Sequence, residues 1–223
     1  MVKKSFNLVK NEVKESLIEN KYILLLSTIL FIFPLILGYL LGHHLQPVLE
    51  PVLDEFKRKV ISGEVKISFD SIFLNNLKAI LIEYAGGIFF GILTFFILVF
   101  NGLFIGYFGF KVVDLKLFLV GIAPHGIFEI PAVIIGAAAG LVFLSFLVKL
   151  IKDIISKNSF DLNQHDYPDE THLTETTKFK FAWNKNYKIL KQSLILLVIS
   201  IFLLIIAAFI ETQITVIMIN LFK

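Results

Sequence analysis

An uncharged run of 21 residues, from Tyr22 to Gly42, constrains the fold of this chain more than any other feature. At a rise of 1.5 Å per residue, a helix of this length crosses the hydrocarbon core of a bilayer, which is about 30 Å thick. The segment before the run is long and contains acidic as well as basic residues, and no small-residue cleavage site follows, which disfavours a removed signal peptide. We therefore expect a retained transmembrane helix.

The composition also favours a membrane protein. Of the 223 residues, 57% are hydrophobic and 17% are charged, against about 45–50% and about 25% in soluble domains. The absence of cysteine excludes disulfides and thiolate metal sites. The net charge of +3, with no dense basic run, argues against nucleic acid as a partner. We expect an all-α, polytopic bundle in the cell membrane, with the lipid bilayer as its solvent.

Further apolar segments predict about five spans, within a range of four to six. Pro124 and Pro131 interrupt one of these segments, and proline frees backbone groups that lipid cannot satisfy, so we expect two joined pieces there. The first piece has about 16 residues and reaches only about 24 Å, which predicts a re-entrant or partly unwound segment. The predicted spans are 22–42, 86–110, 115–130, 131–151 and 189–210.

Amphipathic segments accompany these spans. Residues 1–21 place apolar side chains at helical spacing among lysines and glutamates, which predicts an interfacial or partner-docking helix. Residues 22–223 are expected to form a single transmembrane domain with polar loops at 43–70 and 152–188. The first loop contains a second amphipathic segment that should lie on the membrane surface. Residues 71–85 predict a tilted interfacial or half-inserted helix before the Gly86-Gly87 break.

Lysines predict the orientation. They are frequent before the first span and in the 152–188 loop, and positively charged segments favour the cytoplasmic side. We therefore expect a cytoplasmic N-terminus. With the five spans given above, the short turn from Lys111 to Lys116 should lie on the same side.

Glycines four residues apart predict close helix packing. Lipid offers no hydrophobic drive between helices, so small residues are needed where backbones approach, within one subunit or in a dimer. The pairs are Gly38 with Gly42, Gly87 with Gly91, Gly102 with Gly106, and Gly136 with Gly140.

A few ionisable residues remain inside the apolar segments. Each costs about 2.5–3.5 kcal/mol on insertion scales, so each needs a partner or a polar surrounding. His125 and Glu129 lie four residues apart and would share one helix face. Glu211, near the outer end of the last span, is placed to meet them. Further candidates for the same buried cluster are Asn75, Asn76, Glu83 and Asn101.

Three interpretations of this cluster are open: a hydrogen-bonded knot that caps a broken helix, a recognition surface or small conduit, and a metal or catalytic centre. The spacing of His125 and Glu129 lacks the second histidine of a zinc-protease helix. We therefore predict no catalytic residue, metal or cofactor, and keep a membrane-embedded metal-dependent hydrolase as the enzymatic alternative. Acidic residues with His165 and His172 are assigned to a solvated loop.

The order of these features resembles the stage II sporulation protein M family over residues 20–212. The Pro124–Glu129 segment, followed by a helix of small residues, is the most specific part of the resemblance. The other matching features are Asn75-Asn76 ahead of a glycine-rich span, Asn101-Gly102 with Gly106, Gly136 with Gly140, and Ala208 before Glu211.

The resemblance implies a non-enzymatic membrane component. In endospore formers the namesake of the family acts in the mother-cell membrane as a scaffold for two peptidoglycan-degrading partners during engulfment. We accordingly expect a homo-oligomer or complex subunit that positions other membrane or envelope proteins. The alternative is a transport component with its polar site at His125 and Glu129.

Overall fold

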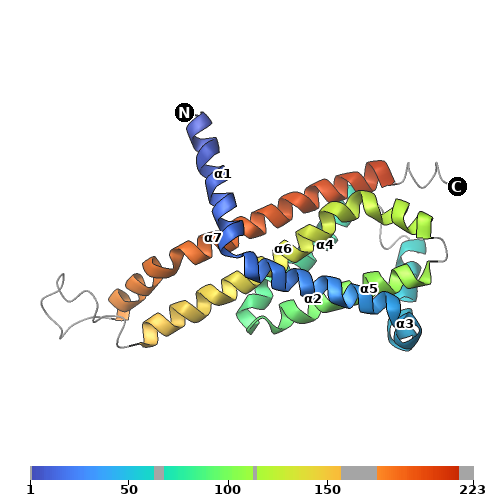
Figure 1. The fold of residues 1–223 in the computed structure, drawn as a ribbon, viewed down its shortest axis with the longest axis horizontal. Helices are drawn as coiled ribbons and strands as arrows, with labels where there is room; N and C mark the ends of the chain where they lie inside the picture. The colour runs from blue at the N-terminus through green and yellow to red at the C-terminus, as the bar shows by residue number, and fades with distance from the viewer. Residues whose placement is uncertain (1, 63–67, 113–114, 157–174, 216–223) are drawn as a thin grey trace, which may run out of the picture.

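The computed structural model describes residues 2–62, 68–112, 115–156 and 175–215 of the chain (Figure 1). Within these ranges every regular element is helical and no strand occurs. Five helices are long and apolar enough to cross a membrane. The predicted all-α, polytopic bundle is therefore confirmed. The loop residues His165 and His172, with their acidic neighbours, lie outside the described residues.

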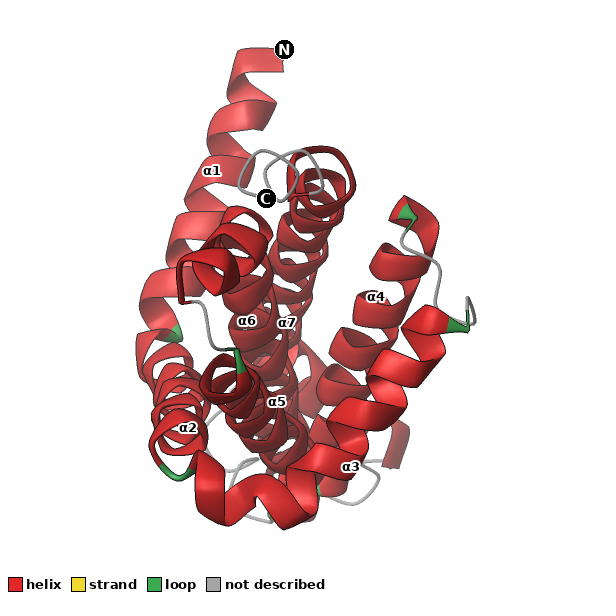
Figure 2. Cartoon of the chain, turned by 90° about the vertical axis from the view of Figure 1, so that its right-hand side faces the viewer, coloured by secondary structure: helices red, strands yellow, loops and turns green. Residues whose placement is uncertain are grey.

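The elements follow in a simple order along the chain. The candidate spans are α2 (Lys21–Leu40), α4 (Phe69–Ala85) with the short 3-10 helix η1 (Gly86–Phe89), α5 (Ile92–Lys111), α6 (Leu115–Ile155) and α7 (Glu175–Ile210). Two amphipathic helices, α1 (Val2–Glu19) and α3 (Gly42–Ile61), flank α2, and the π-helical turn η3 (Glu211–Thr215) follows α7. Helix α6 contacts each of the other four spans, and Figure 2 shows their arrangement around it.

The segment Phe69–Phe89, for which an interfacial or half-inserted helix was expected, is a candidate span. It is long and apolar enough to span the membrane. Its polar residues suggested an interfacial position, but α4 packs against α6 and α7, and its Glu83 is fully buried in the bundle. Of the polar residues of α4, Asn76 and Glu83 thus face the other helices, whereas Asn75 and Lys78 are exposed.

Helix α6 also differs from the prediction, because one helix replaces the expected spans 115–130 and 131–151. It continues for 41 residues through Pro124 and Pro131. Each proline removes only one backbone donor, and the neighbouring helices of a bundle allow such losses at membrane depth. The ribbon of α6 bends between its lime and yellow parts (Figure 1), as expected for a helix that contains proline.

Because α4 runs the length of the bundle before α5 begins, the C-terminus of α5 lies at the opposite end of the bundle from the predicted one. Lys111 forms an ion pair with Glu50 of α3 at 2.8 Å. Helix α3 follows the end of α2, whereas α1 precedes the start of α2 and pairs with the N-terminal half of α7 through Lys188. The prediction that Lys111 lies on the same side as residues 1–21 is therefore wrong. Residues 2–19 and the N-terminal half of α7 do lie at the same end.

Polar loop 152–188 is also shorter than predicted. Helix α6 extends to Ile155 and α7 begins at Glu175, so helices occupy both ends of the expected loop. The two helices pair there: Asp153 accepts hydrogen bonds from Lys185 at 2.9 Å and from Asn186 at 2.7 Å. The paired ends form a helical hairpin that continues beyond the charge-free parts of both spans.

Glycine brings α2 and α5 into backbone contact. A Cβ atom at Gly106 would lie 2.0 Å from the carbonyl oxygen of Leu35, and one at Gly102 would lie 2.3 Å from that of Phe31. A Cβ at Gly38, on the facing side of α2, would be 2.3 Å from the carbonyl oxygen of Leu103. Only residues without a side chain allow this approach.

The turn between α4 and α5 uses glycine in a second way. Gly91 has a φ of +73°, which glycine adopts without strain. Gly87 rests on α6, where its Cβ would lie 2.3 Å from the carbonyl oxygen of Gly140. Thr94 Oγ1 closes the turn by donating to the carbonyl oxygen of Glu83 at 2.6 Å. Two predicted packing glycines remain. A Cβ atom at Gly42 would meet the ring of Phe110, and a Cβ atom at Gly136 would meet the side chains of Ile80 and Ser200.

Serine hydroxyls join α6 and α7. Ser200 Oγ donates to the carbonyl oxygen of Ala132 at 2.6 Å, and Ser193 Oγ donates to that of Ala139 at 2.9 Å. Both serines are buried. Ala132, Gly136 and Ala139 share one face of α6, so small residues again allow the close approach.

Helix α1 is tied to α7 by its acidic residues and leaves apolar residues exposed. Glu15 and Glu19 pair with Lys188 at 2.5 and 2.8 Å, and Glu19 accepts from Gln192 at 2.6 Å. Phe6 and Val9 are 68% and 62% exposed. Helix α1 runs across the direction of the spans (Figure 1), an orientation suited to the membrane interface.

The bundle should be sensitive to a methyl group at Gly106. We expect Gly106→Ala to lower the free energy of unfolding by about 2–3 kcal/mol, because the methyl overlaps a backbone carbonyl that cannot move aside cheaply. Gly136→Ala is the matched control, since its Cβ would meet only side-chain atoms, at 3.0 Å. Its cost should be about 1 kcal/mol or less. Titration of purified protein with a denaturing detergent measures both, and equal costs would contradict backbone contact at Gly106.

Docking of α1 should weaken in acid. Hydrogen bonds from Lys188, then Gln192, hold the pKa of Glu19 below its ordinary value of 4.5. The stabilisation is thus present above pH 4.5 and is lost as the pH falls through the lowered pKa of the docked state. Spin labels on Val9→Cys and Tyr187→Cys, in a chain without other cysteines, report the distance between α1 and α7. In Glu19→Gln the acid-induced change should be smaller; an unchanged acid response would refute the role of Glu19.

Candidate functional site

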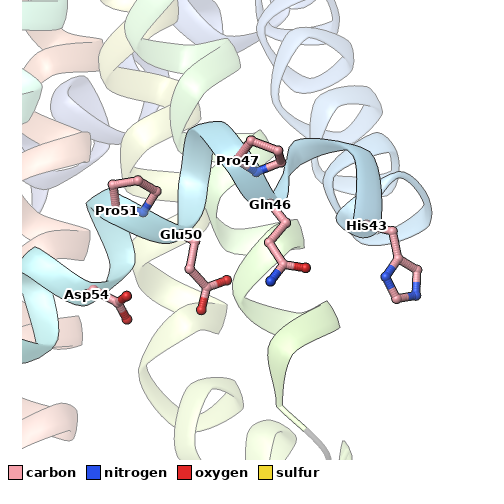
Figure 3. Close-up of a pocket in the computed structure, with 6 residues that line it drawn as sticks. All are labelled: His43, Gln46, Pro47, Glu50, Pro51 and Asp54. Atoms are coloured by element: carbon pink, nitrogen blue, oxygen red, sulfur yellow. The ribbon is translucent and has the colours of Figure 1, made fainter.

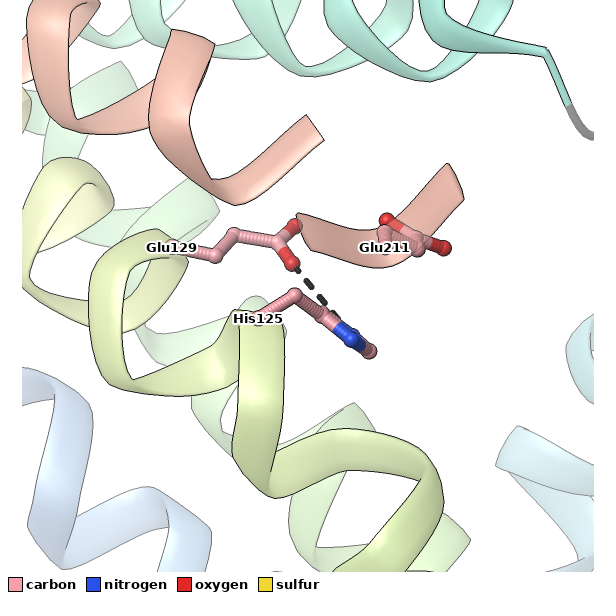
Figure 4. A group of neighbouring side chains, drawn as sticks. All are labelled: His125, Glu129 and Glu211. Carbon is pink, nitrogen blue, oxygen red and sulfur yellow. Dashed lines mark ion pairs between the residues drawn. The ribbon is translucent and has the colours of Figure 1, made fainter. Parts of the chain in front are cut away.

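His125, Glu129 and Asn76 form one polar cluster between α6 and α4. His125 Nε2 lies 3.9 Å from Glu129 Oε2, one helical turn further along α6. Asn76 Nδ2 of α4 donates to Glu129 Oε1 at 2.9 Å. The Glu129 carboxylate therefore offers one oxygen to α4 and turns the other toward the imidazole (Figure 4).

Glu211 completes this cluster from the end of α7. The α-helical hydrogen bonding of α7 ends at Ile210, and Glu211 begins the π-helical turn η3. One ligand atom each from His125, Glu129 and Glu211 lies within 4.8 Å of the others, and all three residues are half-buried. Residues far apart in the sequence thus come together as predicted.

A second polar cluster surrounds Glu83, deeper in the bundle. This residue is 0% exposed. Asn101 Nδ2 of α5 donates to Glu83 Oε1 at 3.5 Å. Among the described residues, Glu83 Oε2 has no hydrogen-bond partner. A buried polar atom without a hydrogen-bond partner lowers the stability of the folded state. The stability of α4 in the bundle therefore depends on the polar groups around Glu83.

The single predicted cluster is therefore two. Asn76 joins His125, Glu129 and Glu211, but Asn101 contacts Glu83 instead. Asn75, which was expected in the same cluster, is exposed. Residues 76, 80 and 83 share a face of α4, and the fully buried Ile80 separates the two polar groups.

A third polar group at the end of α5 was not predicted. The buried Tyr107 hydroxyl donates to Glu50 Oε2 of α3, and Lys111 Nζ pairs with the same oxygen at 2.8 Å. Lys111 and then Tyr107 lower the pKa of Glu50 below its ordinary value. The spacing of Tyr107 and Lys111 put them on one helix face, but nothing in the sequence identified Glu50 as their partner. This group attaches α3 to the bundle.

An open groove on α3 is a weaker candidate site. Figure 3 shows its lining side chains along a single helix. Its volume is about 610 Å³, and it is lined by His43, Gln46, Pro47, Glu50, Pro51 and Asp54. Because a single helix supplies all the lining residues that the structure describes, the groove is open and does not resemble an enclosed small-ligand site.

The three clusters differ in what they can do chemically. The Glu83 group is enclosed and suits a structural role, and the Glu50 group holds a surface helix. The His125 group presents an imidazole and two carboxylates to one point and retains access to solvent. It is the only one of the three that offers several ligand atoms to a cation or a proton.

Comparison with known proteins confirms the resemblance. A sequence model of the stage II sporulation protein M family matches residues 27–216. An uncharacterized protein of Methanocaldococcus jannaschii is 33% identical over 196 residues, covering 86% of this chain and 93% of the relative. A second uncharacterized protein of that organism is 28% identical over 213 residues, covering 92% and 86%. No solved structure matches the chain.

The pair of Glu83 and Asn101 should show strong energetic coupling. We expect Asn101→Leu to cost about 1–3 kcal/mol, because it leaves the buried carboxyl group without its donor. Glu83→Leu should cost a similar amount by leaving the Asn101 amide unpaired. The double variant should cost clearly less than the sum, since it removes both polar groups together.

Unfolding free energies of the four proteins test this prediction. Asn75→Leu is the matched control, because the same substitution at an exposed asparagine should change stability by no more than about 0.5 kcal/mol. Additive costs of the two single variants would show that the Glu83–Asn101 contact carries no coupling energy.

Proposed function

The chain belongs to the stage II sporulation protein M family, and from that premise we propose that it is a non-enzymatic scaffold or complex subunit. It would position partner proteins at the membrane, and it would itself assemble as a homo-oligomer. The multi-pass membrane character follows from the family and the five apolar helices.

The observation that carries the proposal is the hairpin at the paired ends of α6 and α7. The charge-free part of α7 runs from Gln192 to Ile210, and that of α6 ends at Val148. From Glu175 to Tyr187, α7 adds about 20 Å of helix beyond the ion pairs with α1. This stem, made of residues 149–155 and 175–187, is longer than spanning requires.

The stem is held together by side-chain contacts and exposes large apolar side chains among lysines. Phe146 and Trp183 pack edge to face at 5.6 Å between ring centroids, close to the bonds of Asp153. Ile155 remains 75% exposed and Phe179 48% exposed. Large apolar side chains next to charged residues, beyond the charge-free spans, are typical of a surface that binds another protein.

A transport component is the second candidate, and the polar face of α4 favours it. Asn76 and Glu83 lie on that face, and polar groups inside a bundle are also the material of transport sites. Ile80 is fully buried between them, so a path along this face would require α4 to move.

Photocrosslinking in native membranes tests the scaffold proposal. A photoreactive amino acid at Phe179 or Ile155 should give discrete adducts with other polypeptides. The controls are Ile29 and Phe202, which are 53% and 62% exposed on the charge-free spans and should react with lipid. Adducts between two differently tagged copies would identify the homo-oligomer.

Two results would count against the scaffold. Stem positions that react no more specifically than the lipid-facing controls would remove the proposed docking surface. Solute flux into proteoliposomes that Glu129→Gln abolishes, while leaving the fold intact, would establish transport in its place.

A further inference from the structure

Two carboxyl groups lie close together beside His125 without a lysine or arginine partner among the described residues. Glu129 and Glu211 bring two carboxylates together near one end of the spans, with only a histidine between them. In the part of the chain that the structure describes, no lysine or arginine forms an ion pair with either carboxylate. Two half-buried carboxyl groups this close together favour a bound cation or a shared proton.

We propose that His125, Glu129 and Glu211 bind one divalent transition-metal ion. Ligand atoms around a tetrahedral ion with bonds of about 2.0–2.2 Å are about 3.4 Å apart. The imidazole and carboxylate of α6 are already 3.9 Å apart, and the whole group lies within 4.8 Å. Small side-chain rotations therefore bring the three ligands to bonding distance.

The surroundings of the three ligands support this site independently of their charge. Asn76 holds one oxygen of Glu129 by a 2.9 Å hydrogen bond and leaves the other for the ion. Such outer contacts fix the orientation of ligating carboxylates in metal sites. The change to π-helical turns at Glu211 brings the third ligand next to α6, and local π-helix is frequent at functional sites.

The ligand set indicates the class of metal. One imidazole nitrogen and two carboxylate oxygens suit Zn²⁺ or Mn²⁺. Ca²⁺ needs six to eight oxygen ligands, which this group does not supply. A dication neutralises the two carboxylates, and three protein ligands leave at least one coordination position for water or another ligand.

The site and the proposed scaffold do not depend on each other. Both α6 ligands, His125 and Glu129, lie in the N-terminal half of that helix, and Glu211 directly follows the C-terminus of α7. The ion would therefore join the two helices at the end away from the stem. Loss of the metal leaves the stem in place, and loss of a stem contact leaves the ligands in place.

Metal content of the full chain tests the proposal. The protein is purified in lipid nanodiscs, stripped with a chelator and reloaded with Zn²⁺ or, separately, Mn²⁺. We expect one ion per chain by mass spectrometry and a higher unfolding temperature after loading. His125→Ala, Glu129→Gln and Glu211→Gln should each weaken binding at least tenfold.

Variants of histidines outside the site test whether the ion binds elsewhere on the chain. His44→Ala changes an exposed histidine at the start of α3 and should leave binding unchanged. The double variant His165→Ala/His172→Ala should also retain the ion. Loss of binding in the double variant, or retention in the Glu129 and Glu211 variants, would overturn the proposal.

A spectroscopic measurement covers the case in which a variant misfolds. Co²⁺ bound to the wild-type protein should give the intense visible absorption of a four-coordinate site with nitrogen and oxygen ligands. Zn²⁺ should displace it with a stoichiometry of one. Absence of stoichiometric Co²⁺ and Zn²⁺ binding to the folded wild-type protein would refute the site whatever the variants do.

Discussion

Backbone contact at glycine is the interaction on which the rest of the bundle depends. Lipid tails are as apolar as the helices, so association must come from close packing and hydrogen bonds. Gly106 brings α5 against the carbonyl of Leu35, and Gly87 brings the end of α4 against that of Gly140. These contacts place the polar side chains of α4 and α5 inside the protein, where they find partners that they would lack in lipid.

The polar clusters follow from this placement. Once α4 lies on α6, Glu83 is buried opposite Asn101, and Asn76 reaches Glu129. Asn76 and Glu83 would be unfavourable on an isolated helix in lipid, and both make specific contacts in the bundle. Asn76 and Glu83 therefore account both for the prediction from sequence that α4 is interfacial and for the contacts that hold α4 in the bundle.

The sequence predicted the helical class and the pairing of His125 with Glu129, because long charge-free runs and i, i+4 spacing are local properties. The family was predicted by the resemblance of the Pro124–Glu129 segment and its companion motifs. The sequence misjudged α6, since the effect of Pro124 and Pro131 depends on the helices packed around them. It also joined Asn101 to the wrong cluster. Partner choice depends on how α5 is rotated against α4, which is a property of the packed helices and not of local spacing.

The length of α6 separates the two features that matter for function. From Glu129 to Ile151 the helix rises by about 33 Å, roughly the thickness of the hydrocarbon core. The ionisable cluster and the stem therefore lie toward opposite ends of α6. Ser193 and Ser200 tie α7 to α6 between them. A ligand at the cluster therefore acts on the same helix pair that carries the stem, without occupying the surface that partners would use.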